Sequence, residues 1–270
     1  AGITLPIMVM NPEEQGYDSM IQYHLEPEIF SFRVLNMFDE AVKRNNPGAK
    51  SKALPVHLKL DTGMRRLGFE EKDINELIVR MKNNKNLRIQ SVFSHLAASD
   101  ETEHDEFTRQ QVKKFIEMSD NISAHFNEYK IYRHILNSAG ISRFPDAQFD
   151  MARLGIGLYG IGFNNAEQNQ LQNVSTLKTT ISQIKNVSLH ETIGYSRKGI
   201  AKQDMRIATV PIGYADGLSR KLSNGKGKMI VRGKLAPVVG NVCMDMCMID
   251  ITDISASEGD EVIVFGEGHS

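Results

Sequence analysis

Lysine, aspartate and arginine side chains gather at the end of one apolar run of the sequence. Lys59 and Asp61 lie two residues apart, so they share one face of a strand whose other face is apolar. Arg65 and Arg66 follow in a turn bounded by glycines. Charges that point into a barrel are costly unless they are paired. The cluster therefore predicts either a functional site or a charge-rich surface loop.

Polar side chains also follow later apolar runs. His95 could act as an acid, a base or a ring-stacking group, or it could be a hydrogen-bonded structural residue. Asn137 and Ser138 could bind a ligand or cap the next helix. Arg153 lies within an apolar stretch and keeps its charge, so it must find hydrogen-bond acceptors.

The segment from Gly155 to Gly160 matches the pattern G-x-G-x-x-G. A dinucleotide site would need a helix after these glycines and an acidic residue further on. The sequence continues instead into a polar stretch at 164–173. A dinucleotide site is therefore disfavoured, whereas backbone N–H groups in such a turn could still hold a phosphate.

Two tyrosines and a methionine-rich stretch mark the second half of the chain. Tyr195 and Tyr214 each follow a glycine, and the residues from Cys243 to Met248 alternate thiols and thioethers around Asp245. Each feature could equally reflect packing against a sheet or core filling.

The elements that carry these residues differ between the two halves. Residues 1–163 alternate short apolar runs with amphipathic helical stripes, which predicts a parallel sheet covered by helices. Successive apolar runs end in polar clusters. In a barrel the carboxyl ends of all strands meet at one face, whereas in an open sheet they meet only at the point where the strand order reverses, so the repeated clusters favour an α/β barrel. The expected strands are 5–10, 55–60, 91–93, 131–136 and the stretch 151–158; the expected helices carry the stripes 34–42, 74–81 and 112–122.

We place a linker at 164–173 and a mostly β domain at 174–270. Helical periodicity is absent there, and glycine or Asn-Gly turns separate short strand-like runs. These runs are 177–184, 206–211, 228–231, 236–239, 246–251 and 261–265.

Composition excludes several classes of protein. The 270 residues carry 32 Lys plus Arg against 33 Asp plus Glu, a formal charge of −1, which disfavours a protein that tracks nucleic-acid phosphates. Cys243 and Cys247 are too few for a disulfide scaffold or a zinc site, so we expect no metal and a reducing, cytoplasmic location. No apolar run reaches the roughly 20 residues of a membrane span.

Seven segments, taken together, resemble the alanine racemases, pyridoxal-phosphate enzymes with a TIM-type barrel followed by a β domain. The segments recur in family order over nearly the whole chain. They are HLKLDTGMRRLGF (57–69), SHLAASDE (94–101), LNSAG (136–140), FDMARLGIGLYG (149–160), IGYSRKG (193–199), TVPIGYADG (209–217) and VGNVCMDM (239–246).

The resemblance implies a reaction. Alanine racemases interconvert L-alanine and D-alanine through an aldimine of pyridoxal phosphate and an α-carbanion, and so supply D-alanine for peptidoglycan. Tyr195 matches the catalytic tyrosine, which is contributed across a homodimer interface to the partner's cofactor. Arg66, Met244 and Asp245 match residues of the substrate pocket.

The resemblance also implies the contacts of the cofactor. His95 matches the histidine beside the pyridine ring and Arg153 the arginine that faces the pyridine nitrogen. Lys59 matches a lysine that is carbamylated in many members and holds Arg66; Asp61 lies beside it, and Tyr214 matches a tyrosine in the His–Arg network. The phosphate contacts fall on Asn137, Ser138, Gly155 and Ile156.

An arginine at the pyridine nitrogen has a chemical consequence. Its pKa lies above about 12, so it stays protonated and can only donate a hydrogen bond to the nitrogen, which therefore stays neutral. The carbanion is then less delocalised, which favours prompt reprotonation over transamination.

The chain departs from the family pattern at its ends. Family members carry the Schiff-base lysine near the N-terminus, and here no lysine occupies that position; the phosphate-binding tyrosine of the C-terminal segment is also missing. We therefore expect an interior fragment that does not racemise alanine at an enzyme-like rate by itself. The alternatives are a non-catalytic protein that binds pyridoxal phosphate or an amino acid, and a racemase of another small amino acid such as serine.

Overall fold

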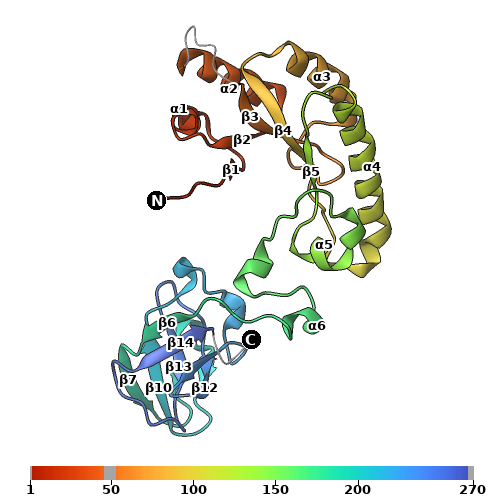
Figure 1. Cartoon of the computed structure of the whole chain (residues 1–270). Coiled ribbons are helices and arrows are strands. Elements are labelled where there is room, and N and C mark those ends of the chain that lie inside the picture. The colour runs from red at the N-terminus through yellow and green to blue at the C-terminus, as the bar shows by residue number, and fades with distance from the viewer. Residues whose placement is uncertain (1, 46–52, 267–270) are drawn as a thin grey trace. The chain divides into compact units, whose positions relative to one another are not determined.

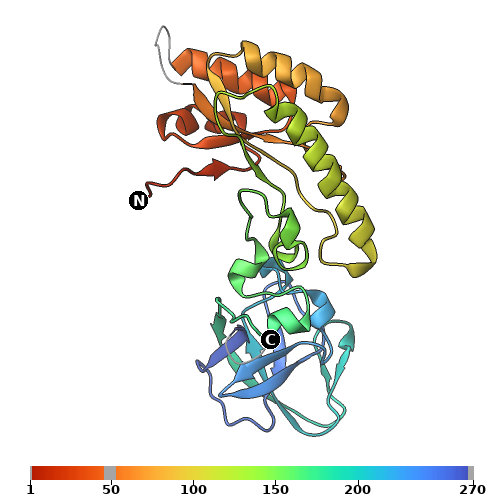
Figure 2. The same ribbon diagram turned by 45° about the vertical axis from the view of Figure 1, so that its right-hand side comes forward.

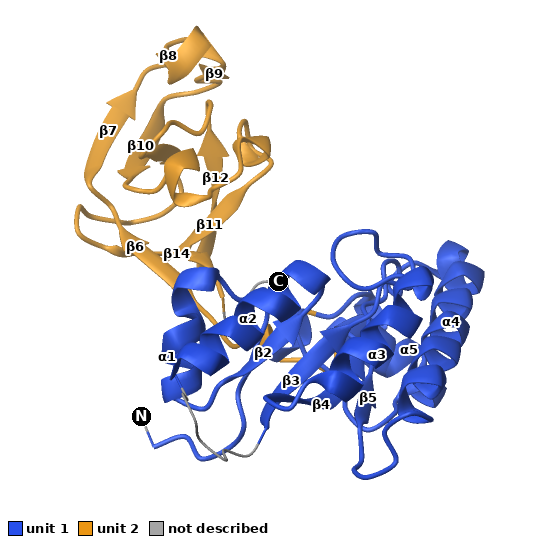
Figure 3. Cartoon of the chain, turned by 90° about the horizontal axis from the view of Figure 1, so that it is seen from above, with its two compact units in different colours: residues 1–158, 162–168 blue, residues 159–161, 169–270 orange. Residues whose placement is uncertain are grey.

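A computed structural model describes residues 2–45 and 53–266. The chain forms two compact units, one of residues 1–158 with 162–168 and one of residues 159–161 with 169–270 (Figure 1; Figure 3). The polar stretch predicted as a linker contains a short helix, α6 (Asn165–Gln168).

The first unit is built on a parallel sheet of five strands in the order β1-β2-β3-β4-β5. The prediction of an incomplete α/β barrel is confirmed, because parallel strands alternate with covering helices (Figure 2). The strands are β1 (Met8–Val9), β2 (Glu26–Ile29), β3 (Leu54–Lys59), β4 (Leu87–Phe93) and β5 (Tyr132–His134). The helices are α1 (Tyr17–Gln22), α2 (Phe32–Asn45), α3 (Ile74–Asn83), α4 (Asp105–Ser123) and α5 (Ser138–Arg143). None of these helices, nor α6, is long and apolar enough to cross a membrane.

Two segments of this unit differ from the sequence expectation. Strand β2 has the sequence Glu-Pro-Glu-Ile, whose polar residues hide it, yet all four residues are buried. The stretch around Arg153 forms no strand. It runs beside β5, where Asp150 N donates to Arg133 O at 2.9 Å and Arg153 N donates to Leu136 O at 3.0 Å.

The two faces of the parallel sheet have different chemistry. On one face, Val56 and Leu58 of β3 and Ile89 and Val92 of β4 join the buried residues of α2, α3 and α4 in one hydrophobic cluster. Ile89 and Val92 share this face, although they are three residues apart, because the pairing of β3 with β4 shifts register between them. The other face carries alternate residues of the same strands, because side chains point to opposite sides with period two. Those alternate residues are largely polar or charged, and the candidate site is built from them.

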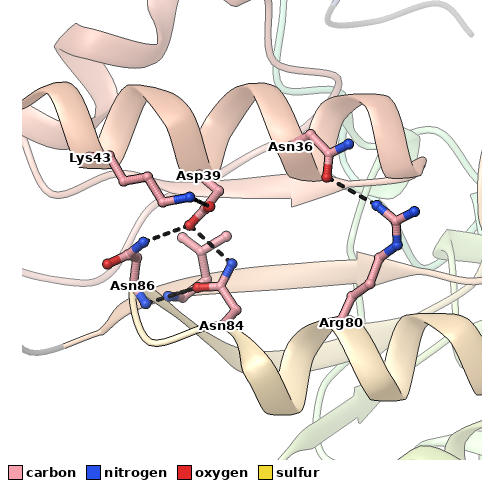
Figure 4. Close-up of polar contacts among 7 residues, drawn as sticks. Asn36, Asp39, Lys43, Arg80, Asn84 and Asn86 are labelled. Carbon is pink, nitrogen blue, oxygen red and sulfur yellow. Dashed lines mark hydrogen bonds and ion pairs between the residues drawn. The ribbon is translucent and has the colours of Figure 1, made fainter.

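Polar contacts hold α2 against the turn between α3 and β4 (Figure 4). Asp39 Oδ1 accepts from Asn84 Nδ2 at 3.0 Å and from Asn86 Nδ2 at 2.8 Å, and Asp39 Oδ2 pairs with Lys43 Nζ at 2.5 Å. Asn84 Oδ1 also accepts from the backbone N–H of Leu87 at 2.9 Å, at the start of β4. These contacts fix where β4 begins.

The second unit contains an antiparallel sheet of seven strands in the order β6-β14-β11-β12-β13-β10-β7, which confirms the predicted β domain. The predicted run 177–184 divides into two strands, and the two-residue strands β8 (Thr192–Ile193) and β9 (Gly199–Ile200) were not predicted. The other strands are β6 (Leu177–Thr180), β7 (Gln183–Val187), β10 (Met205–Val210), β11 (Lys228–Val231), β12 (Lys234–Val239), β13 (Cys247–Asp250) and β14 (Glu261–Phe265).

Candidate active site

The loop after β3 presents Arg66 to solvent. Asp61 is buried, and its Oδ1 accepts from the backbone N–H of Gly63 at 2.9 Å and of Arg65 at 3.1 Å. The loop returns at Gly68, whose φ of +132° and close approach leave no room for a side chain, since a Cβ there would lie 2.7 Å from Asp61 N. Asp61 therefore shapes the turn, and Arg66 is exposed at its tip.

Lys59 forms an ion pair inside the first unit. Its Nζ lies 2.8 Å from Glu28 Oε1, and both side chains are at most 5% exposed. The contact lacks hydrogen-bond alignment at Oε1, whereas Glu28 Oε2 accepts from the backbone N–H of Asn11 at 2.6 Å. The family resemblance implies that Lys59 holds Arg66. In the described part of the chain, the Lys59 ammonium instead contacts Glu28 and the Phe93 ring. Lys59 is thus a buried cation neutralised by the neighbouring strand.

The Arg153 guanidinium lies at the ends of β4 and β5. Nη2 donates to Ser94 O at 2.6 Å and to Ile135 O at 3.3 Å, and Nη1 donates to His134 Nδ1. Burial lowers the pKa of Arg153 to about 10, and the charge of Glu28 opposes this shift. The arginine is therefore still a cation near pH 7, and the requirement for acceptors anticipated from the sequence is met.

Two imidazoles beside Arg153 are neutral near pH 7. His95 Nδ1 lies 3.4 Å from Arg153 Nη2, and burial with the nearby charge of Arg153 lowers the pKa of His95 to about 4. Burial and the same charge lower the pKa of His134 to about 3. His134 also stacks on Phe93, with ring centroids 5.0 Å apart. Both rings can accept a hydrogen bond from the guanidinium only because they are uncharged.

A cluster of hydrogen-bond donors lies next along the chain. Ser138 Oγ accepts from the backbone N–H of Gly155 at 2.9 Å and of Gly157 at 3.1 Å, in the same glycine-rich segment as the exposed Ile156. Both N–H groups converge on the Ser138 hydroxyl oxygen, so the hydroxyl proton is the donor left for an anion such as a phosphate. Asn137 caps α5: its Oδ1 accepts from Gly140 N at 2.9 Å and from Ser99 Oγ at 2.7 Å. Its helix-capping alternative is the one that the structure shows.

In the second unit, Tyr195 sits on a strained turn. Gly194, Ser196 and Arg197 have φ values of +75°, +55° and +52°. Left-handed backbone costs roughly 1–2 kcal/mol for residues with a Cβ. The side chain of Tyr195 is 70% exposed, and its carbonyl accepts from Asn241 Nδ2 at 3.2 Å.

Tyr214, Met244 and Asp245 lie close together in the same unit. Tyr214 N donates to Cys243 O at 3.0 Å, and Ala215 N donates to Met244 O at 2.9 Å. Gly213 allows this approach, because a Cβ there would lie 2.1 Å from Met244 O. Met244 is 53% exposed, which rules out a role as core filler.

The predicted residues thus form two groups, one in each unit. Lys59, Asp61, Arg66, His95 and Arg153, with the residues of the Ser138 cluster, belong to the first unit, and Tyr195, Tyr214, Met244 and Asp245 belong to the second.

Sequence reasoning missed Glu26, Glu28, His57, Ser91 and His134, which are all buried on the polar face of the sheet. A usable signal existed at His57, which alternates with Lys59 and Asp61 and therefore shares their face.

Profiles of two protein domains match the chain. "Alanine racemase, N-terminal domain" matches residues 1–162, and "Alanine racemase, C-terminal domain" matches residues 174–270.

Individual proteins agree with this match. Alanine racemase 1 of Clostridium acetobutylicum is 40% identical over 274 residues, which covers 99% of this chain and 69% of that protein. The alanine racemase of Clostridium tetani is 37% identical, with 98% and 68% covered. The solved structure of alanine racemase from Clostridium difficile 630 gives a TM-score of 0.83 at 33% identity, covering 99% of this chain and 69% of that one.

The buried ion pair predicts that Glu28→Gln lowers the free energy of unfolding more than a Glu→Gln substitution at an exposed ion pair does. Glu28→Gln leaves the Lys59 ammonium buried without its counter-charge, and breaking such a pair costs about 3–5 kcal/mol. Glu76→Gln removes an exposed pair with Arg80 and should cost at most about 1 kcal/mol. Urea unfolding of both variants measures the difference. Equal losses would show that Lys59 does not depend on Glu28.

His95 predicts a pH dependence of stability. Its folded pKa of about 4 lies below the ordinary value of 6.5, so the unfolded chain takes up the proton first as the pH falls. The free energy of unfolding should therefore fall between about pH 6.5 and pH 4. His95→Asn should reduce that slope by up to one proton, measured by urea unfolding at several pH values. Parallel slopes for both proteins would contradict the assignment.

Proposed function

Since the chain belongs to the alanine racemase family, we propose that its residues bind the pyridoxal phosphate and the substrate of an enzyme that interconverts L-alanine and D-alanine. The observation that carries the proposal is the pairing of an acceptor-bound arginine with a phosphate-type donor cluster, two residues apart at Arg153 and Gly155. The enzyme would supply D-alanine for peptidoglycan.

The residues of the first unit suit this cofactor. The Ser138 hydroxyl, held by the N–H groups of Gly155 and Gly157, suits its phosphate together with Gly155 and Ile156. The Arg153 guanidinium suits an unprotonated pyridine nitrogen. His95 would lie beside the ring. Pyridoxal phosphate, when bound, withdraws electrons from the α-carbon of an amino acid and so makes its proton removable.

Arg153 would control where protons go. Its donors are aimed at carbonyl oxygens and at two neutral imidazoles, and it offers no acceptor. A guanidinium that faces a ring nitrogen can only donate a hydrogen bond to it, so the nitrogen would stay unprotonated. This environment would keep protonation at the α-carbon, as racemisation requires.

Tyr195 is the proposed base on one side of the α-carbon. A tyrosine of pKa about 10 needs nearby cations to work at neutral pH. Its 70% exposure leaves the phenol free to serve a partner's site, which supports a homodimer with shared sites. Arg66, also exposed, would bind the substrate carboxylate, with Met244 and Asp245 at the partner's pocket. Lys59, whether carbamylated or paired with Glu28, and Asp61 would support the loop that carries Arg66. For Tyr214 we propose the supporting role that the family resemblance implies.

We also propose a cytoplasmic location for the protein. Cys243 and Cys247 are both free thiols, which fits a reducing compartment. Burial raises the pKa of Cys247 to about 12, so this thiol is unreactive.

Ser138→Ala should weaken binding of pyridoxal phosphate but leave binding of pyridoxal, which lacks the phosphate, nearly unchanged. Loss of one hydrogen bond to a charged group is worth about 1.5–3 kcal/mol, or roughly 10- to 100-fold in affinity. Equilibrium dialysis measures both ligands. Ser142→Ala removes a hydroxyl of α5 that donates to Glu167 Oε1 of α6, and it is the matched control. Equal weakening of both ligands would disprove the phosphate role.

Borohydride reduction tests the lysine assignment. We expect that incubation with pyridoxal phosphate, reduction and mass spectrometry will find no stoichiometric label on a lysine of residues 1–270. A label on a peptide outside these residues would identify an ordinary racemase. Complete absence of a label would favour a protein that binds the cofactor without catalysis, and a label on Lys59 would require the site to be redrawn.

A further inference from the structure

Four buried polar side chains lie in one row across the polar face of the parallel sheet. They come from successive strands: Glu26 from β2, His57 from β3, Ser91 from β4 and His134 from β5. His57 and Ser91 are direct neighbours in the strand register. All four are at most 9% exposed. None of them has a role in the function proposed above, so the cost of burying them needs an explanation.

Hydrogen bonds connect the row from end to end. Glu26 Oε2 lies 2.9 Å from His57 Nε2, and His57 Nδ1 lies 2.6 Å from Ser91 Oγ. Ser91 Oγ lies 3.1 Å from His134 Nε2. His134 Nδ1 contacts Arg153 Nη1, which extends the row to the proposed cofactor site.

The chemistry of Arg153 fixes the direction of every bond in this row. A guanidinium has donors only, so His134 Nδ1 must accept and its proton must lie on Nε2. His134 Nε2 then donates to Ser91 Oγ, which leaves the Ser91 hydroxyl proton for His57 Nδ1. His57 therefore carries its own proton on Nε2 and donates it to the Glu26 carboxylate. Each ring is neutral and holds one defined tautomer.

We propose that Glu26, His57 and Ser91 are positioning residues that hold His134 in the Nε2-protonated form and thereby fix Arg153. Bonds that all point the same way polarise one another. The negative charge of Glu26 thus strengthens His134 Nδ1 as an acceptor for the cationic guanidinium. Any effect of the row on a bound cofactor rests on the function proposed above, but the hydrogen bonds of the row do not.

The surroundings of the row fit this role. Phe93 stacks on His134 and also lies under the guanidinium, with Arg153 Cζ 5.2 Å from the ring centroid. Burial lowers the pKa of His57, as it does for His134, and the nearby charges of Glu26 and Glu28 oppose this shift while Arg88 adds to it. Neutral rings are what a chain of single-direction hydrogen bonds requires.

Nitrogen-15 NMR of the cofactor-free protein tests the tautomers. We expect the rings of His57 and His134 to be neutral and protonated on Nε2 between pH 6 and pH 8. A proton on Nδ1 of either ring, or a charged ring, would overturn the proposed direction of the hydrogen bonds. This readout needs neither bound cofactor nor activity, so it can succeed or fail independently of the proposed racemase function.

A double-mutant cycle tests the coupling. Glu26→Gln keeps an acceptor oxygen for His57 but removes the charge, and it should speed exchange of the Arg153 side-chain N–H protons by about three- to tenfold. In the Ser91→Ala background, where the row is cut, the same substitution should have no effect. The matched control is Glu76→Gln on the exposed face of α3.

Two outcomes of this cycle would overturn the proposal. Unchanged exchange in Glu26→Gln would show that the carboxylate does not act on Arg153. An equal effect with and without Ser91 would show that Glu26 acts through its general electric field instead of through the row. If Ser91→Ala does not fold, the single Glu26→Gln measurement and the ring tautomers still decide.

Discussion

The first unit depends on the fact that a guanidinium can donate hydrogen bonds but cannot accept them. Arg153 is largely surrounded by protein, so each of its donors must meet an acceptor. The carbonyls of Ser94 and Ile135 supply two, because the strands β4 and β5 end beside it. The other acceptors are imidazole nitrogens, which accept only when the rings are neutral. Burial and this one cation together keep His95 and His134 neutral.

The need to pair buried cations explains why one face of the sheet is polar. Glu28 neutralises Lys59 on the neighbouring strand, and Phe93 lies beside both cations, 5.6 Å from Lys59 Nζ. The opposite face packs on helices through aliphatic residues such as Val56 and Leu58. Strand alternation lets one short segment, residues 54–59, build the hydrophobic core and the polar interior simultaneously.

The sequence predicts the fold class and most elements, because their patterns are local. The stripe in 74–81 gives α3, and the runs 228–231 and 261–265 coincide with β11 and β14. Strand β2 was missed because Glu26 and Glu28 make it look like a loop. The roles assigned to Tyr195 and Arg66 came from family resemblance. The pairing of Glu28 with Lys59 and the row from Glu26 to Arg153 depend on strand register, which a single sequence does not reveal.

The turn that carries Tyr195 has a consequence for how this protein can change over time. Ser196 and Arg197 hold left-handed backbone that glycine would adopt without strain. Replacing either with glycine would recover folding stability, yet it would also let the turn sample other shapes and release the phenol from one orientation. At these two positions, a substitution that stabilises the fold therefore also loosens the orientation of the Tyr195 side chain. The turn marks a place where thermostable variants should be hard to obtain without loss of function.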